Sequence, residues 1–75
     1  MPHVIVKMFP GRSEQQKTEL AQQIVQDMIR IANSQEKSIS VAIEEVKPEH
    51  WNAKVYQPDI EACWDSLYKK PGYKP

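Results

Sequence analysis

Residues 13–33, SEQQKTELAQQIVQDMIRIAN, predict a long amphipathic helix. Ser13 is a good N-cap, and Gln16 three residues later completes a capping box. We expect about five turns, ending near Asn33-Ser34. One side is apolar and the other polar, with Leu20, Ala21, Ile24, Val25, Met28, Ile31 and Ala32 on the first and Glu19, Gln22, Gln26 and Arg30 on the second.

A strand is predicted on each side of this helix. Residues 3–9, HVIVKMF, are rich in Val, Ile and Phe and stop at Pro10-Gly11. Residues 38–46, SISVAIEEV, alternate between apolar and small or polar side chains and end at Lys47-Pro48. Strand, helix and strand form a βαβ unit, so we expect parallel strands and a right-handed crossover.

The remainder predicts a C-terminal helix. Residues 49–58, EHWNAKVYQP, are ambiguous and suggest a short helical turn followed by a loop. Asp59 is a plausible N-cap for a helix that continues past Cys63 and Trp64 to Tyr68, with Pro71-Gly72 as its stop. Cys63 is expected to be a small buried apolar residue there, and Trp64, Leu67 and Tyr68 to form a packing face. The chain is therefore expected to be one α+β domain, residues 1–75.

The size of the chain predicts an oligomer. It has 75 residues and a single cysteine, so it cannot form an intrachain disulfide. Chains of this size usually need a staple or a partner. One crossover helix covers one face of a parallel sheet, and two strands make a narrow sheet. We therefore expect a homodimer with a four-stranded sheet, and no persistent monomer.

Composition argues against several classes of protein. Ten basic residues balance ten acidic ones, and Lys69-Lys70 is the only basic cluster, which is not the footprint of a nucleic-acid-binding protein. No apolar stretch is long enough for a signal peptide or a membrane span, so a soluble cytoplasmic protein is expected. His3, His50 and Cys63 do not have the spacing of a metal site.

Pro2 is the candidate catalytic residue. Proline is small enough for the initiator methionine to be removed, which would leave its ring nitrogen as a free secondary amine. Such an amine acts as a base at neutral pH only if its pKa is lowered, by apolar surroundings or by a nearby cation. Trp51 is the candidate apolar wall, and Arg12 the candidate cation. The planar fork of Arg12 also suits a substrate carboxylate.

These residues resemble the 4-oxalocrotonate tautomerases. The resemblance includes Pro2, GRSEQQK at 11–17, the long helix, SISVAIEE at 38–45 and Trp51, and the ending KKPGY at 69–73 resembles the dimeric branch that acts on phenylpyruvate enols. It implies a cofactor-independent isomerase in which Pro2 moves a proton from the enol hydroxyl to carbon. Arg12, Trp51 and Ser40 are the substrate-binding positions that it implies.

Ser40 departs from the family pattern. Many hexameric members have a second arginine at this position, which grips the α-keto acid end of the substrate. Its loss favours a monoacid with a hydrophobic tail, such as the enol of phenylpyruvate, over a dicarboxylate. Two alternatives stay open: a non-catalytic βαβ dimer that binds a small acid or a protein, and a related hydratase or dehalogenase. Fold alone does not decide between them.

Overall fold

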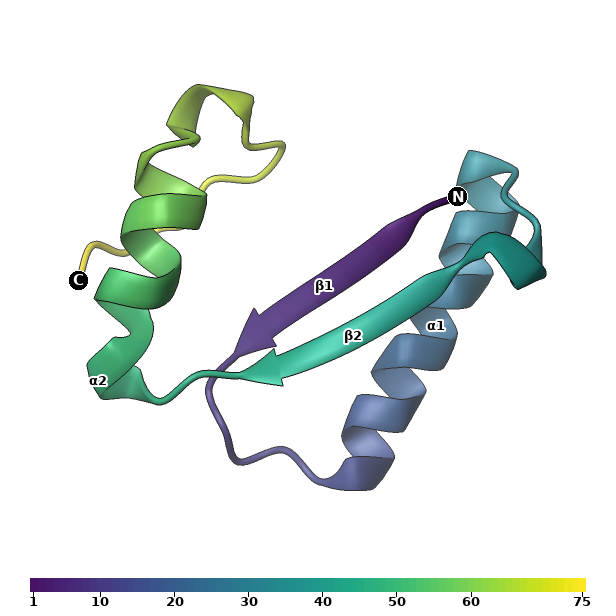
Figure 1. The fold of residues 1–75 in the computed structure, drawn as a ribbon, viewed down its shortest axis with the longest axis horizontal. Helices are drawn as coiled ribbons and strands as arrows, with labels where there is room; N and C mark the ends of the chain where they lie inside the picture. The colour runs from purple at the N-terminus through teal and green to yellow at the C-terminus, as the bar shows by residue number, and fades with distance from the viewer. The chain divides into compact units, whose positions relative to one another are not determined.

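The computed structural model describes all residues from Met1 to Pro75. The chain divides into two compact units, Met1–Glu45 and Val46–Pro75. Figure 1 shows the strands and the long helix of the first unit and the helical segment of the second. No helix reaches the length and hydropathy that crossing a membrane would require.

The first unit contains the predicted pair of parallel strands. Strand β1 spans His3–Met8 and strand β2 spans Ser40–Glu45. They pair in parallel, with His3 opposite Ser40 and Met8 opposite Glu45. The second strand begins later than predicted, because Glu36–Ser38 form a short 3₁₀ helix, η1, ahead of it. Each strand is thus six residues long, and Pro2 precedes the first of them.

Helix α1, Glu14–Ala32, has the ends that the sequence predicts. The Ser13 hydroxyl accepts a bond of 3.1 Å from the backbone N–H of Gln16, and the Gln16 side chain accepts one of 2.8 Å from the N–H of Ser13. Asn33 ends the helix in the left-handed conformation, with φ of 56°, and its N–H donates to the carbonyl of Met28. Asparagine tolerates that conformation better than most residues, so the local sequence determines both ends of α1.

The capping box gives a direct test of this helix. Ser13→Ala removes the hydroxyl that satisfies the Gln16 N–H, and we expect it to lower the free energy of unfolding by about 1 kcal/mol. Chemical denaturation at a fixed protein concentration measures the change. Ser34→Ala is the matched control, since Ser34 bonds Met28 through its backbone N–H alone and should unfold like the wild type. Equal stability of the two variants would contradict the capping role.

The buried stripe of α1 differs from the predicted one. Ala21, Ile24, Val25 and Met28 are partly buried as expected, and Ile29 joins them. Leu20 and Ile31, which were predicted to lie in the apolar stripe, are 36% and 67% exposed. The helix packs on a sheet of only two strands, which is too narrow to cover an apolar face of the predicted width. In Figure 1, α1 passes behind the two strands.

An ion pair joins the start of α1 to the end of β2. The Lys17 ammonium lies 2.8 Å from the carboxylate of Glu14 and 3.5 Å from that of Glu45. Hydrogen bonding to Glu14 is the largest cause that raises the pKa of Lys17, while partial burial opposes it and the charges of Glu14 and Glu45 add to it. Lys17 therefore engages both of these carboxylates.

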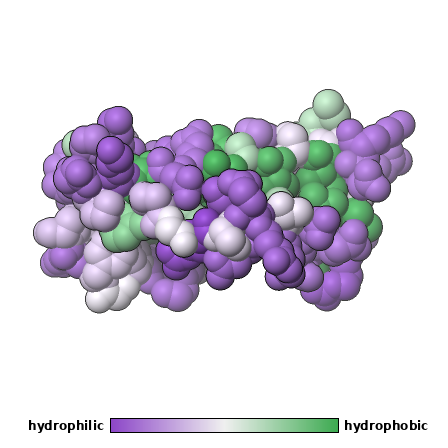
Figure 2. Space-filling view, turned by 90° about the horizontal axis from the view of Figure 1, so that it is seen from below, coloured by the Kyte–Doolittle hydropathy of each residue, from purple (hydrophilic) through white to green (hydrophobic).

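The opposite face of the sheet is not covered within the unit. Side chains alternate along a strand, so His3 and Ile5 share a face with Ser40 and Ala42, away from the face where Glu45 meets α1. Ile5 is 49% exposed on it. In the whole chain only Val55 and Tyr56, both in the second unit, are buried apolar residues. Hydrophobic residues reach the surface between hydrophilic ones (Figure 2).

The second unit corrects the predicted C-terminal helix. Helix α2, Pro48–Trp51, runs into a π-helix, η2, at Asn52–Glu61, whereas the prediction was a loop up to Pro58 and a new helix from Asp59. Asp59 therefore lies inside a helical segment, and the prediction that it is an N-cap is wrong. Pro48 starts the segment because its fixed φ suits the first helical turn. The N–H of Ala62 bonds the carbonyl of Gln57 in the wider π pattern around Pro58, which has no N–H to donate.

Residues after Glu61 form less regular structure than predicted. A short 3₁₀ helix, η3, spans Trp64–Ser66, and no regular element follows it. Cys63 is exposed, so the prediction of a buried thiol is wrong. Of the predicted packing face, Leu67 is partly buried within the chain, whereas Trp64 and Tyr68 are exposed. The helix begins at Pro48 rather than at Asp59, and it has therefore ended before these side chains can form one helical face.

Candidate functional site

Pro2 and Ser40 lie together at the start of the parallel sheet. The Ser40 backbone N–H donates to the Pro2 carbonyl at 3.2 Å. Pro2 is partly buried, whereas Met1 before it is completely exposed. The local pairing follows from the register, in which β2 begins opposite the residue that follows Pro2. The structure thus brings together two of the four predicted site residues.

His3 completes this group, although the sequence led us to consider it as a metal ligand, and to exclude that role. Its Nδ1 lies 2.6 Å from the Ser40 hydroxyl oxygen, and both side chains are exposed. Aligning the two strands in parallel register would have placed His3 opposite Ser40, because residues opposite each other in a sheet share a face. That register was the missing signal. Pro2, His3 and Ser40 are called the sheet-start cluster below.

Arg12 lies beyond the other end of β1. The six residues of that strand span roughly 20 Å, which is several times the reach of an arginine side chain. Gly11 before it has a φ of 131°, a conformation that L side chains rarely adopt, and Ser13 after it is the N-cap of α1. Arg12 and the sheet-start cluster therefore lie at opposite ends of the sheet in one chain.

The Arg12 guanidinium is exposed and makes no hydrogen bond or ion pair within the chain. The nearest acidic residue in the sequence, Glu14, pairs with Lys17 instead. Arg30, the other arginine of the chain, lies 3.3 Å from Asp27 on the same helix. Arg12 is thus the arginine whose five N–H donors remain available to an external carboxylate.

Trp51 belongs to an aromatic cluster of the second unit. Its indole Nε1–H donates to the Tyr73 hydroxyl at 2.7 Å. The Tyr73 ring packs on that of Tyr56, with 5.6 Å between centroids and 54° between planes, and Tyr56 is 5% exposed. These contacts hold the C-terminal segment on the helical one and restrict the orientation of the indole. Sequence reasoning missed Tyr73, which follows a Pro-Gly stop and has no periodic pattern to reveal its contact.

Tyr73→Phe tests the aromatic cluster. It removes the hydroxyl that accepts the Trp51 N–H and keeps the ring that packs on Tyr56, so we expect a loss of about 1 kcal/mol in the free energy of unfolding. The fluorescence of Trp51 should also change, because its N–H would then bond to water. Tyr68→Phe is the matched control, as Tyr68 is fully exposed. Identical stability and emission for both variants would show that the hydrogen bond does not form.

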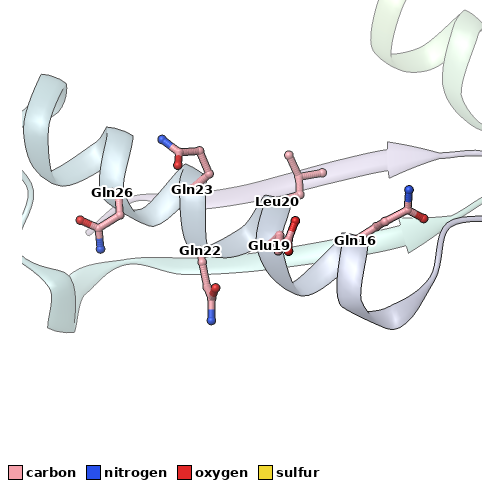
Figure 3. Close-up of a pocket in the computed structure, with 6 residues that line it drawn as sticks. All are labelled: Gln16, Glu19, Leu20, Gln22, Gln23 and Gln26. Atoms are coloured by element: carbon pink, nitrogen blue, oxygen red, sulfur yellow. The ribbon is translucent and has the colours of Figure 1, made fainter.

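The outer face of α1 carries a concave surface in which Glu19 is the only ionisable side chain. Gln16, Glu19, Leu20, Gln22, Gln23 and Gln26 line it, and all six come from this one helix (Figure 3). Gln16 is engaged in the capping box, and the Gln23 amide donates to Asp27 at 3.1 Å. Glutamines offer neither a base nor a nucleophile, and the single carboxylate of Glu19 comes with no cation in this lining to hold a substrate anion. The sheet-start cluster therefore remains the candidate site.

Comparison with known proteins shows which family the chain matches. Residues 2–56 match the family described as "Tautomerase enzyme". The chain is 46% identical over 74 residues to "Tautomerase PptA" of Enterobacter sp. (strain 638), with 97% of each chain covered. It is 42% identical over 73 residues to a "Probable tautomerase" of Xylella fastidiosa, covering 97% of this chain and 89% of that one.

Solved structures give the same result for the fold. The structure titled "Crystal Structure of YwhB- Homologue of 4-Oxalocrotonate Tautomerase" superposes with a TM-score of 0.66 at 32% identity, over 79% of this chain and 98% of that one. This likeness confirms the predicted α+β fold with its parallel strand pair. The family match begins at Pro2 and includes Arg12, Ser40 and Trp51. The chain belongs to the tautomerase family and is an isomerase.

Proposed function

We propose that the protein interconverts the enol and keto forms of small 2-oxo acids, such as the enol of phenylpyruvate, with Pro2 as the general base. The observation that carries this proposal is the place of Pro2, at the head of β1 and anchored to β2 through its carbonyl, in a chain of the tautomerase family. Removal of Met1 frees the ring nitrogen. That nitrogen then takes the proton of the enol hydroxyl and delivers it to the carbon of the enol double bond that does not bear the oxygen.

The reaction needs proton transfer and charge stabilisation, and no cofactor takes part. As the enol proton leaves, negative charge develops on the oxygen, and a cationic donor lowers the barrier most when it is already in place. Arg12 is proposed for this role and for holding the carboxylate of the substrate. Trp51 is proposed as the apolar residue that disfavours the charged form of the amine. Ser40 is proposed as the fourth member of the site.

The span of β1 implies that Arg12 serves the site of a second protomer. One chain separates Arg12 from Pro2 by the length of the strand, so both residues can act on one small molecule only if another copy supplies one of them. The proposed homodimer satisfies this requirement. It also covers sheet surface that the single chain leaves open, such as Ile5.

A dimer is therefore the expected state in solution. Two βαβ units joined into a four-stranded sheet would bury apolar side chains that are exposed in one chain. Sedimentation at micromolar concentration should give twice the mass of the chain. A folded monomer at that concentration would contradict the assembly, and a hexamer would show that three such dimers associate further.

Substrate choice is the test of the proposed reaction. With a single arginine available, the site can grip one carboxylate, so a monoacid with a hydrophobic tail should react better than a dicarboxylate. Ketonisation of phenylenolpyruvate and of 2-hydroxymuconate, a dicarboxylate enol, can be followed by absorbance with the same enzyme. The proposal expects a higher kcat/KM for phenylenolpyruvate. A clear preference for the dicarboxylate, or no turnover of either enol, would refute it.

A further inference from the structure

We propose that Ser40 and His3 form a positioning pair that fixes the peptide on which the Pro2 ring is mounted. This inference rests on the proposed function of Pro2 and adds to it. Neither side chain need touch the substrate. Their contribution is to the orientation of the base rather than to binding or to proton transfer.

Ser40 contacts both other members of the sheet-start cluster. Its backbone N–H holds the Pro2 carbonyl at 3.2 Å, and its hydroxyl lies 2.6 Å from Nδ1 of His3, the next residue along β1. The peptide plane between Pro2 and His3 is therefore fixed on both sides by one residue of β2. Once Met1 is removed, the Cα–C bond of Pro2 is the one backbone torsion left between this plane and the ring nitrogen.

Fixing that plane matters because a base must be held within hydrogen-bond reach of the proton it takes. Displacement of a catalytic group by about 1 Å costs on the order of 100-fold in rate. The hydrogen bond between the His3 and Ser40 side chains contributes little to the free energy of unfolding, since both side chains are exposed and water can replace either partner. A positioning role therefore predicts that breaking this bond lowers kcat clearly and changes the free energy of unfolding little.

Substitutions that keep or remove one atom separate this role from simple packing. His3→Asn keeps a polar atom close to the position of Nδ1, whereas His3→Gln moves its amide to the position of Nε2 and loses the bond. Ser40→Thr keeps the hydroxyl, and Ser40→Ala removes it. Ser38→Ala is the matched control, because Ser38 lies two residues earlier and its hydroxyl makes no hydrogen bond within the chain.

The experiment measures kcat and KM of full-length dimer for phenylenolpyruvate ketonisation, with thermal unfolding of each variant. Ser40→Ala and His3→Gln should each lower kcat by about tenfold with little change in KM. Ser38→Ala should stay near wild type, and Ser40→Thr and His3→Asn, which keep the bond, should each lose less kcat than Ser40→Ala and His3→Gln. The double variant Ser40→Ala/His3→Gln should be no slower than the worse single one, because both remove the same bond.

Two results would overturn the pair. One is an unchanged kcat in Ser40→Ala and His3→Gln, with or without a change in stability; the other is multiplicative losses in the double variant. Pro2→Ala in the same assay separates this outcome from failure of the proposed function. Full activity of Pro2→Ala would refute the assignment of Pro2 as the base. An inactive Pro2→Ala beside normal Ser40→Ala and His3→Gln variants would refute only the positioning pair.

Discussion

Pro2→Ala should lower kcat/KM for phenylenolpyruvate by about 10²–10⁴-fold, the range that a general base contributes. Alanine also allows Met1 to be removed, so the variant keeps a free terminal amine. That amine is primary, lacks the ring, and rotates about a bond that the ring of proline would restrict. The substitution therefore changes the base and its geometry while leaving β1 and its pairing with β2 in place.

Intact mass is the control for this comparison. Wild type and Pro2→Ala should both lack Met1, and both should sediment as the same oligomer. When both conditions are met, the difference in kcat/KM is caused by the change of the terminal amine. Equal kcat/KM values in two correctly processed proteins would show that Pro2 is not the base.

Arg12→Ala should lower kcat/KM by roughly 10–100-fold, because a hydrogen bond to a charged group contributes about 1.5–3 kcal/mol. Arg12→Lys keeps the charge and loses the paired donors, so its kcat/KM should fall between those of wild type and Arg12→Ala. Stability should change little, since the Arg12 side chain is exposed and makes no contact that α1 needs. Wild-type activity in Arg12→Ala would exclude it from the site.

Mixing the two impaired variants in equal amounts tests whether the site is shared between protomers. A heterodimer of Pro2→Ala with Arg12→Ala contains one site with both substitutions and one site with neither. After the subunits exchange at random, activity should recover to about a quarter of wild type, because half of the dimers are mixed and half of their sites are intact. Activity no higher than the average of the separate variants would mean that Arg12 acts within its own chain.

The first unit could be predicted from sequence because its signals are local. Ser13 and Gln16 form the capping box through bonds three residues apart, and Asn33 adopts the left-handed cap. Strand alternation and the helix between the strands then determine parallel pairing. The width of the buried stripe on α1 was overestimated at Leu20 and Ile31, because periodicity does not report how many strands the helix covers.

The second unit was predicted less well, since competing local signals overlap there. Asp59 has the chemistry of an N-cap, but the helix had already begun at Pro48 and passed through it. Of the site, Pro2 was proposed from its place behind the initiator methionine and Ser40 from the family resemblance, whereas the contact of Ser40 with His3 depends on strand register. The opposite position of Arg12 follows from the length of β1, which the strand predicted over residues 3–9 already implies.

Titration of the Pro2 nitrogen is the most direct test of the central claim. Protein labelled with ¹⁵N-proline should show one amine resonance distinct from the prolines within the chain, and its chemical shift should follow pH. The account predicts a pKa below that of an ordinary prolyl amine and equal to the lower pKa in the pH dependence of kcat/KM. A nitrogen still in amide linkage to Met1, or one charged throughout the neutral range, would contradict it.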